Sequence, residues 1–121
     1  KNCVGAVVES CSAKDGTGIR DYIHVVDLAK GHLAALKATD TPGAKVYNLG
    51  SGKGSSVLEI IKAFEDASGK PLPHRISDRR PGDLAEIFAD PSKAKREFGW
   101  QTELTVADAM RDTINFLNNQ K

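Results

Sequence analysis

The stretch that decides the fold class is residues 45–64, which read KVYNLGSGKGSSVLEIIKAF. β-prone residues at 45–49 predict a short strand, and a glycine loop follows at 50–54. Ser56 and Glu59 fit a capping box at the start of a helix. Apolar residues then recur with the spacing of one helix face, at positions 57, 60, 61 and 64. A strand, a glycine loop and a helix in this order predict an α/β fold.

Upstream of this stretch, the residues predict two strands and a helix. β-prone residues indicate strands over 3–8 and 20–25, and turn-forming residues lie between them. Asp27 fits the cap of a helix that runs to about residue 37. The apolar face of that helix is predicted to consist of Ala29, Leu33 and Leu36.

Downstream, the pattern predicts one more strand and two helices. The strand covers 74–76, and Asp90 followed by Pro91 is typical of a helix start, with a stop near Gly99. A last helix is expected from Thr105 to about residue 117. Its apolar residues are predicted to face inward; these are Val106, Met110, Ile114 and Leu117.

Composition sets the broad class. The chain has 121 residues, of which 40% are apolar and 27% charged, with a formal net charge of +1. These values are typical of one folded domain and exclude disorder or a coiled coil. Because the formal net charge is only +1, nothing predicts a nucleic acid or a membrane surface as a partner. No apolar run approaches the roughly 18 residues of a membrane span. The two cysteines, Cys3 and Cys11, are too few for a disulfide framework, so we expect free thiols and a cytoplasmic location.

The glycine loop at 50–54 is the first candidate for chemistry. A glycine loop that precedes a helix can cradle an anion, but it can equally be a tight turn. The phosphate-binding loop pattern fails because Gly54 follows Lys53, and the dinucleotide pattern fails because Ser55 stands at its last glycine position. Both interpretations of the loop stay open at this point.

A second candidate is the run Arg79-Arg80-Pro81-Gly82-Asp83, because adjacent guanidinium groups can clamp a diphosphate. Arg20 could supply a further phosphate contact, and Tyr22 could stack or donate a hydrogen bond. The alternative for the run is a solvated charged turn. His24 is interpreted as a half-buried histidine with satisfied ring nitrogens. The spacing of the three histidines fits no metal site, and the chain has no Tyr-x-x-x-Lys pair.

Four segments together resemble one enzyme family. They are Asp15-Gly16-Thr17-Gly18-Ile19-Arg20-Asp21-Tyr22-Ile23-His24-Val25 continued by Asp27-Leu28, the segment 47–57, the run 79–83 and Phe98-Gly99-Trp100. In sequence and spacing they resemble the UDP-glucose 4-epimerase family of extended short-chain dehydrogenases, over about residues 14–118. The first segment is long and specific, whereas Arg-Pro-Gly-Asp recurs in related nucleotide-sugar enzymes.

The resemblance implies a division of labour within that family. An N-terminal Rossmann domain binds NAD and carries the catalytic Tyr-x-x-x-Lys pair, and the C-terminal part binds the UDP group of the substrate. Carried over to this chain, Arg20 and Arg80 would bind the diphosphate, Asp83 the ribose, and Val57 the uracil region. Tyr22 would lie in the same pocket.

The resemblance also implies that residues 1–121 form a single truncated domain. It would comprise the UDP-sugar-binding part together with the last strand and helix of the Rossmann half. Residues 1–13 do not resemble the family and form an atypical N-terminal segment. Because the NAD fingerprint and the catalytic Tyr and Lys are absent, we expect no catalytic residue, no cofactor site, no metal site and no epimerase turnover in this chain alone.

Two alternatives remain beside this interpretation. The chain could belong to a sister nucleotide-sugar dehydratase or decarboxylase, or it could be a free-standing module that binds a nucleotide or associates with itself. Without a Rossmann half, the apolar residues Leu33, Leu36, Val46 and Leu49 are expected to lie exposed. We therefore predict a homo-oligomer, a domain-swapped assembly, or a separate chain that supplies the missing half.

Overall fold

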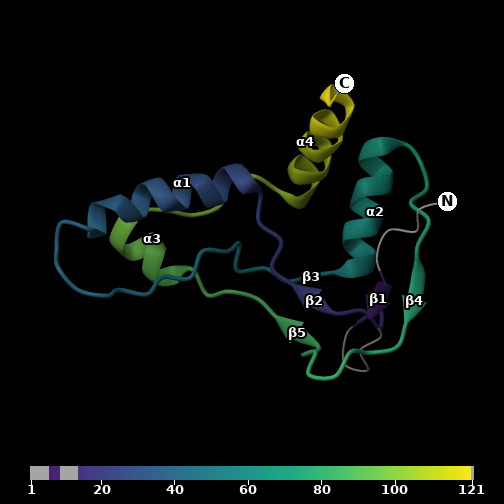
Figure 1. Ribbon diagram of the computed structural model, residues 1–121, viewed down its shortest axis with the longest axis horizontal. Coiled ribbons are helices and arrows are strands. Elements are labelled where there is room, and N and C mark those ends of the chain that lie inside the picture. Colours follow the sequence, from purple (N-terminus) through teal and green to yellow (C-terminus); the bar gives the residue numbers. More distant parts are fainter. Residues whose placement is uncertain (1–5, 9–13, 121) are drawn as a thin grey trace.

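The computed structural model describes residues 6–8 and 14–120. The strands are β1 (Ala6–Val8), β2 (Ile19–Arg20), β3 (Ser55–Ser56), β4 (Arg75–Ser77) and β5 (Glu86–Ile87). The helices are α1 (Val25–Ala35), the short 3-10 helix Leu36–Ala38, α2 (Val57–Ser68), α3 (Ser92–Phe98) and α4 (Val106–Asn119). Figure 1 shows α1 and α3 at one end of the molecule and α2, β1 and β4 at the other. This alternation confirms the predicted α/β class.

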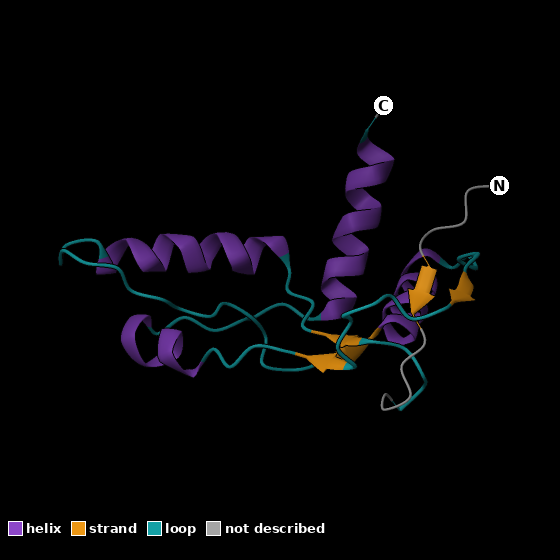
Figure 2. Cartoon of the chain, turned by 60° about the horizontal axis from the view of Figure 1, so that its bottom comes forward, coloured by secondary structure: helices purple, strands orange, loops and turns teal. Residues whose placement is uncertain are grey.

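The strand β2 lies at the centre of a three-stranded sheet with the order β3-β2-β5. It runs antiparallel to β3, with Arg20 opposite Ser55, and parallel to β5, with Arg20 opposite Ile87. A second sheet pairs β1 with β4 in parallel. Figure 2 shows the three-stranded sheet between the α1 end and the α2 end of the molecule. The sheet thus places Arg20 between two neighbouring strands.

The helices α2 and α4 begin and pack as their sequences predict. Capping boxes start both helices, formed by Ser56 with Glu59 and by Thr105 with Asp108. Gly69 ends α2 in the left-handed conformation, at φ 68°. The two helices pack against each other, and Ile61 of α2 is buried. On α4, Val106, Met110 and Ile114 are half-buried as expected, but Leu117 is 54% exposed, so its predicted inward position is wrong.

At the other end, Trp100, in the segment that follows α3, packs against α1. Trp100 is 6% exposed, and its Nε1 donates a hydrogen bond to the carbonyl of Asp27 at 3.0 Å. Gly31 allows this close approach, because a Cβ there would lie 2.8 Å from Leu49 Cδ1 and 3.1 Å from Trp100 Cε2. Ala94 of α3 is fully buried. These contacts attach α1 to the C-terminal part of the chain.

The predicted cap of α1 is wrong. His24, not Asp27, is the N-cap, and its Nδ1 accepts a hydrogen bond from the amide of Val26 at 3.0 Å. Asp27 lies in the first turn with no exposed surface, and its Oδ2 accepts hydrogen bonds from the amides of Glu103 at 3.0 Å and Leu104 at 2.9 Å. Asp27 therefore fixes the segment before α4 instead of starting α1.

Several strand boundaries also differ from the sequence prediction. The strand predicted over 45–49 is irregular, and it has no ladder partner in the part of the chain that the structure describes. The strand predicted over 20–25 is confirmed only as β2, because the chain leaves the ladder after Arg20. The strand predicted over 3–8 is confirmed at Ala6–Val8, and residues 3–5 lie outside the described residues. The last predicted strand, at 74–76, is β4.

Helix α3 begins at Ser92, one residue later than predicted, with Pro91 as the N-cap. Asp90 still supports this start, because its Oδ1 accepts a hydrogen bond from the amide of Ser92 at 3.0 Å. The predicted stop is confirmed at Gly99, which is left-handed at φ 69°. Both cysteines, and with them the expectation of free thiols, lie outside the described residues.

The apolar face predicted for α1 is exposed. Leu33 is 67% and Leu36 60% exposed, and Val46 on the following segment is 77% exposed. This confirms the expected exposure of those three residues. Leu49 was also expected to be exposed, but it packs against Gly31 and is half-buried. Among the helices of the described residues, none has the length and apolar character needed to cross a membrane.

Candidate functional site

The site lies around the segment 15–27, whose polar side chains each fix a different part of the chain. Asp15 and Thr17 hold the start of α2. Asp15 Oδ1 accepts hydrogen bonds from the amide of Thr17 at 2.9 Å and its hydroxyl at 2.7 Å, and Oδ2 accepts one from the hydroxyl of Ser56. Thr17 is 1% exposed, and its Oγ1 lies 3.4 Å from the amide of Leu58.

The charge of Asp15 is stabilised by this arrangement. Burial acts to raise the pKa of Asp15, but the hydrogen bonds from Ser56 and Thr17 outweigh it and hold the pKa below the ordinary value of 3.8. The first segment of the resemblance therefore begins with a structural anchor for α2, whose first residue is Val57. It places Val57 next to β3 and hence beside β2.

The glycine loop takes its conformation from Asp21. The carboxylate accepts hydrogen bonds from the amide and hydroxyl of Ser51 and from the amides of Gly52 and Ala89. Burial acts to raise the pKa of Asp21, but these hydrogen bonds outweigh it and lower the pKa. Of the two interpretations left open by the sequence, the tight turn is therefore correct for Ser51 and Gly52, whose amides face an internal carboxylate.

His24 uses both of its ring nitrogens. Because Nδ1 accepts from Val26, the proton of the neutral ring lies on Nε2, which donates to Oδ2 of Asp112 on α4 at 3.0 Å. Hydrogen bonds from Arg111 and from His24 lower the pKa of Asp112. His24 is 6% exposed, so it is more deeply buried than the half-buried position expected, whereas the expectation of satisfied ring nitrogens is confirmed. It has no free lone pair with which to act as a base.

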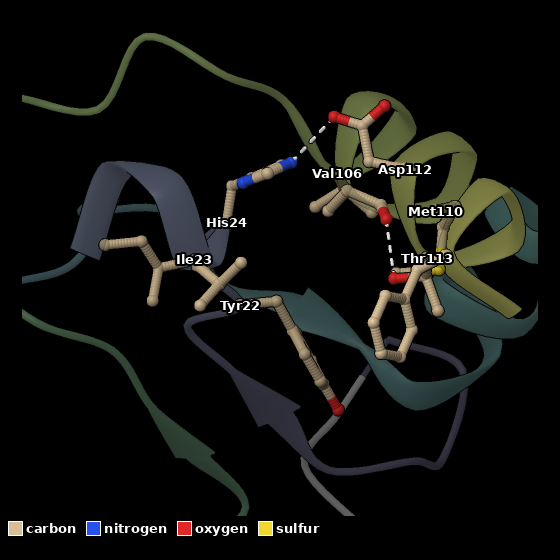
Figure 3. Close-up of a pocket in the computed structure, with 10 residues that line it drawn as sticks. Tyr22, Ile23, His24, Val106, Met110, Asp112 and Thr113 are labelled. Atoms are coloured by element: carbon tan, nitrogen blue, oxygen red, sulfur yellow. Dashed lines mark hydrogen bonds and ion pairs between the residues drawn. The ribbon is translucent and has the colours of Figure 1, made fainter. Parts of the chain in front are cut away.

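A pocket of about 460 Å³ opens beside this pair (Figure 3). Its lining is mainly apolar and comes from the start of α1 and from one side of α4. The residues are Tyr22, Ile23, His24, Val25, Val106, Ala109, Met110, Asp112, Thr113 and Phe116. The hydroxyl of Tyr22 points away from the His24–Asp112 pair in Figure 3. Because His24 and Asp112 are paired with each other and the Thr113 hydroxyl donates to the carbonyl of Ala109, this wall offers apolar contact rather than acid–base chemistry.

Tyr22 separates this pocket from a smaller, more polar one of about 270 Å³. The smaller pocket is lined by Tyr22, Ser51, Lys53 and Ser55 together with residues 102–106. Burial raises the pKa of Tyr22, while the positive charge of Arg20 acts in the opposite direction. Tyr22 thus lies near Arg20, with its ring available for contact on both sides.

Arg20 and Arg80 occupy different environments. Arg20 is half-buried in β2, and its Nη1 donates to the carbonyl of Ile19 at 2.7 Å. Arg80 is exposed, and its Nε lies 2.8 Å from Oδ2 of Asp83 in the turn before β5. The structure therefore brings Arg80 and Asp83 together, and Arg20 with Tyr22. The turn that carries Arg80 leads into the strand beside Arg20, because the amide of Ile19 donates to the carbonyl of Ala85 at 2.9 Å.

The sequence did not reveal the roles of Asp15, Asp21 and Asp27. Of the hydrogen bonds that these carboxylates accept within the described residues, only the two from Thr17 to Asp15 are local. Each carboxylate accepts at least one hydrogen bond from a residue between 30 and 77 positions away along the chain. The only available signal is their regular recurrence, every six residues, within the segment of the resemblance. Within residues 6–8 and 14–120, no group of three or more potential metal ligands comes together.

Comparison with known proteins places the chain in a family. Residues 7–113 match the family described as GDP-mannose 4,6 dehydratase. The chain belongs to this family. The match covers most of the chain and includes every polar residue of the site described above, from Asp15 to Asp112. It agrees with the resemblance to extended short-chain dehydrogenases.

Within the GDP-mannose 4,6 dehydratase family, the chain is similar to UDP-glucose 4-epimerases. It is 58% identical to the enzyme of Bifidobacterium longum over 102 residues, which are 84% of this chain and 30% of that one. It is 59% identical to the enzyme of Bacillus subtilis over 101 residues, 83% of this chain and 30% of that one. The chain thus spans about 30% of the length of the curated relatives it matches.

A solved structure supports the same relationship. The crystal structure of UDP-glucose 4-epimerase from Bifidobacterium longum, in complex with NAD+ and UDP, aligns with 90% of this chain and 32% of its own. The TM-score is 0.85 and the sequence identity 54%. The similarity therefore holds in both sequence and fold, and it confirms the resemblance to the epimerase family. The NAD+ in that crystal structure is a ligand of the longer relative.

Proposed function

We propose that the chain is the C-terminal UDP-sugar-binding part of an NAD-dependent UDP-glucose/UDP-galactose 4-epimerase. Arg20 and Arg80 would bind the diphosphate, Asp83 the ribose and Val57 the uracil region, with Tyr22 in the same pocket. The observation that carries this assignment is the register of the sheet. Arg20 in β2 lies beside β5, which directly follows the turn that holds Arg80 and Asp83.

The chemistry of these residues suits a nucleotide diphosphate. Guanidinium groups form bidentate, charge-assisted hydrogen bonds with phosphate oxygens, and a carboxylate can accept hydrogen bonds from ribose hydroxyls. Binding energy from this non-reacting part of the substrate can hold the sugar in place for the reaction. Arg20 is anchored by the sheet and Arg80 is exposed on a turn, so the two could close on a diphosphate from two sides.

The 121 residues do not fit NAD. Their glycine loop departs from the dinucleotide fingerprint at Ser55, and its first amides already bind Asp21. The chain also contains no Tyr-x-x-x-Lys pair. We therefore expect these residues to bind the UDP group without epimerase turnover of their own, and hydride transfer would require a Rossmann half.

Calorimetric titration of the chain with UDP, and with NAD in parallel, tests this function. UDP should bind and NAD should not. Arg20→Ala and Arg80→Ala should each weaken UDP binding at least tenfold, because each removes a charged phosphate contact. Arg96→Ala, an identical charge change on α3, should leave the affinity unchanged. Absence of UDP binding to the unmodified chain, or equal losses in all three variants, would contradict the proposal.

A sister nucleotide-sugar dehydratase or decarboxylase is the second candidate, because the matching family is described by a GDP-sugar dehydratase. A dehydratase for a GDP-sugar and an epimerase for a UDP-sugar differ in the base that they recognise. UDP and GDP titrations of the same sample separate them, since a uridine site should prefer UDP by at least tenfold. A preference for GDP would favour the dehydratase.

We also propose that the isolated chain self-associates through the exposed face of α1. Val25, Leu33 and Leu36 are 72%, 67% and 60% exposed and form an apolar surface that a second copy could cover. Sedimentation velocity should show an oligomer, and Leu33→Asp with Leu36→Asp should convert it to a monomer. A monomer at high concentration before any substitution would contradict self-association, including a domain-swapped form.

A free-standing, cytoplasmic module that only binds a nucleotide would show UDP binding without the oligomer.

A further inference from the structure

We propose that Asp21 is a positioning residue that occupies the glycine loop as an internal anion and fixes Arg20 for the nucleotide diphosphate. For the identity of its ligand, this inference rests on the proposed function. Its geometry rests on a separate set of contacts, in which one carboxylate connects three segments of the chain: the end of β2, the glycine loop 50–54, and the end of β5.

The carboxylate of Asp21 accepts four hydrogen bonds. Oδ1 receives the amide of Ser51 at 2.9 Å and its hydroxyl at 2.6 Å. Oδ2 receives the amide of Gly52 at 3.0 Å and the amide of Ala89 at 3.2 Å. The donors lie 30, 31 and 68 residues away in the sequence, so they depend on the fold and not on a local turn. These four hydrogen bonds use the roughly four acceptor positions of a carboxylate.

The backbone around Asp21 leaves room for this carboxylate only because residue 50 is glycine. A Cβ on Gly50 would lie 2.5 Å from Oδ2 of Asp21 and 2.6 Å from Cβ of Ala89, which is closer than real side chains approach. Gly50 is itself buried. The loop is therefore built around the Asp21 side chain and could not keep this position with a larger residue at 50.

The internal anion determines where an external phosphate can bind. Consecutive amides of a glycine loop are an ordinary phosphate site, because their N–H groups converge on a negative charge. Here the amides of Ser51 and Gly52 converge on Asp21, so a second negative group at the same place would be repelled. A nucleotide diphosphate is thereby directed to Arg20 and Arg80 instead of the glycine loop.

Asp21 also completes the attachment of Arg20 to the neighbouring strand. On one side of Arg20, the amide of Ile19 donates to the carbonyl of Ala85; on the other side, Asp21 accepts from the amide of Ala89. These two contacts hold β2 against β5 before and after Arg20. Successive side chains of an extended chain point to opposite sides, so Asp21 can bind the loop while Arg20 remains available on the other side. The contacts fit this alternation, because the Arg20 side chain lies beside Gly18 whereas the Asp21 side chain binds the glycine loop.

The test uses nuclear magnetic resonance on the full 121-residue chain and its Asp21→Asn variant. Asparagine keeps the size of the side chain but places an amide group against N–H donors. Without ligand, the amides of Ser51, Gly52 and Ala89 should exchange with solvent at least tenfold faster, and the Nε signal of Arg20 should shift. With UDP, the Nε signal of Arg80 should still respond, whereas the response of Arg20 should be lost and the affinity should fall at least tenfold.

Two further variants show whether the effect is specific to the Asp21 carboxylate. Asp66→Asn changes the same charge on the exposed side of α2, where Asp66 pairs with Lys62, and should alter none of these signals. Ser51→Ala removes one of the four donors to Asp21, the Ser51 hydroxyl. If Asp21→Asn does not fold, Ser51→Ala should still change the same exchange rates and the same Arg20 signal, by a smaller amount. Unchanged exchange and an unchanged Arg20 signal would overturn the inference, as would equal loss of the Arg20 and Arg80 responses. Failure of the unmodified chain to bind UDP would remove the proposed function, and the ligand-free measurements would still decide whether Asp21 positions Arg20.

Discussion

Arg80 Nε lies 2.8 Å from Asp83 Oδ2, so the two residues that we propose to bind the diphosphate and the ribose form an ion pair with each other. The Arg80 side chain is 73% exposed, and such a surface pair stabilises a fold by less than about 1 kcal/mol. The turn therefore loses little when Arg80 moves to a phosphate. The pair holds the two side chains close together, but it is weak enough for Arg80 to bind a phosphate and Asp83 a ribose hydroxyl instead.

This exchange leads to a prediction for Asp83→Ala. If Asp83 binds ribose, its removal should weaken UDP binding by about tenfold, which corresponds to about 1.4 kcal/mol. If the carboxylate only competes with phosphate for Arg80, the affinity should rise instead. Calorimetry with UDP distinguishes the two signs. A tighter complex would show that Asp83 restrains Arg80 and has no role in ribose binding.

Acid should destabilise the fold through Asp15 and Asp21. The pKa of each is lower in the folded chain than its ordinary value of 3.8, so each carboxylate stabilises the fold above about pH 4. This stabilisation is lost as the pH falls through the folded pKa values. Urea unfolding between about pH 6 and pH 2.5 should show the loss, with a flatter profile in Asp15→Asn and Asp21→Asn. Asp66→Asn, on an exposed face, should follow the unmodified chain. Identical profiles in all variants would be incompatible with these roles.

Gly50→Ala should cost more stability than a glycine substitution that introduces only backbone strain. The new Cβ would collide with Asp21 and Ala89, and such overpacking costs typically about 1–3 kcal/mol. Gly69→Ala is the comparison, because Gly69 has a left-handed φ of 68° but open space around it. It should lose about 1 kcal/mol, because a left-handed φ is unfavourable for a residue with a Cβ. Thermal unfolding measures both, and a loss at Gly50 no greater than that at Gly69 would argue against a close-packed loop.

Asp27→Ala should destabilise the attachment of α1 to the segment before α4. It leaves the amides of Glu103 and Leu104 without their acceptor, and an unsatisfied buried group costs about 1–3 kcal/mol. Asp40→Ala, at an exposed loop position, should change stability by less than about 0.5 kcal/mol. Denaturant unfolding compares the two. Equal stability of both variants would mean that the amides find another partner.

The helices could be predicted from the sequence because their signals are local. The capping boxes at Ser56 and Thr105 and the stop at Gly69 each involve residues within a few positions of one another. The cap of α1 was missed, because His24 and Asp27 are both plausible caps, and only the distant amides of Glu103 and Leu104 draw Asp27 into the interior.

The strands were harder to predict because each depends on a distant partner. The strands β3 and β5 have two residues each and carry no periodic pattern, yet they flank Arg20. The β-prone segment at 45–49 has no partner strand in the described part of the chain, so its propensity produces no ladder. Likewise, the sequence could suggest the residues of the candidate site by resemblance, but not that Asp21 fills the glycine loop.

The proposed function requires that one UDP molecule contact both strand β2 and the turn before β5. The most direct test is a UDP titration of the chain followed by amide chemical shifts, with Arg80→Ala as the comparison. In the unmodified chain, shifts are expected at Arg20, Tyr22, Val57, Arg80 and Asp83. In Arg80→Ala, the shifts at the other four residues should be lost together. No shift at millimolar UDP, or shifts confined to the glycine loop, would contradict it.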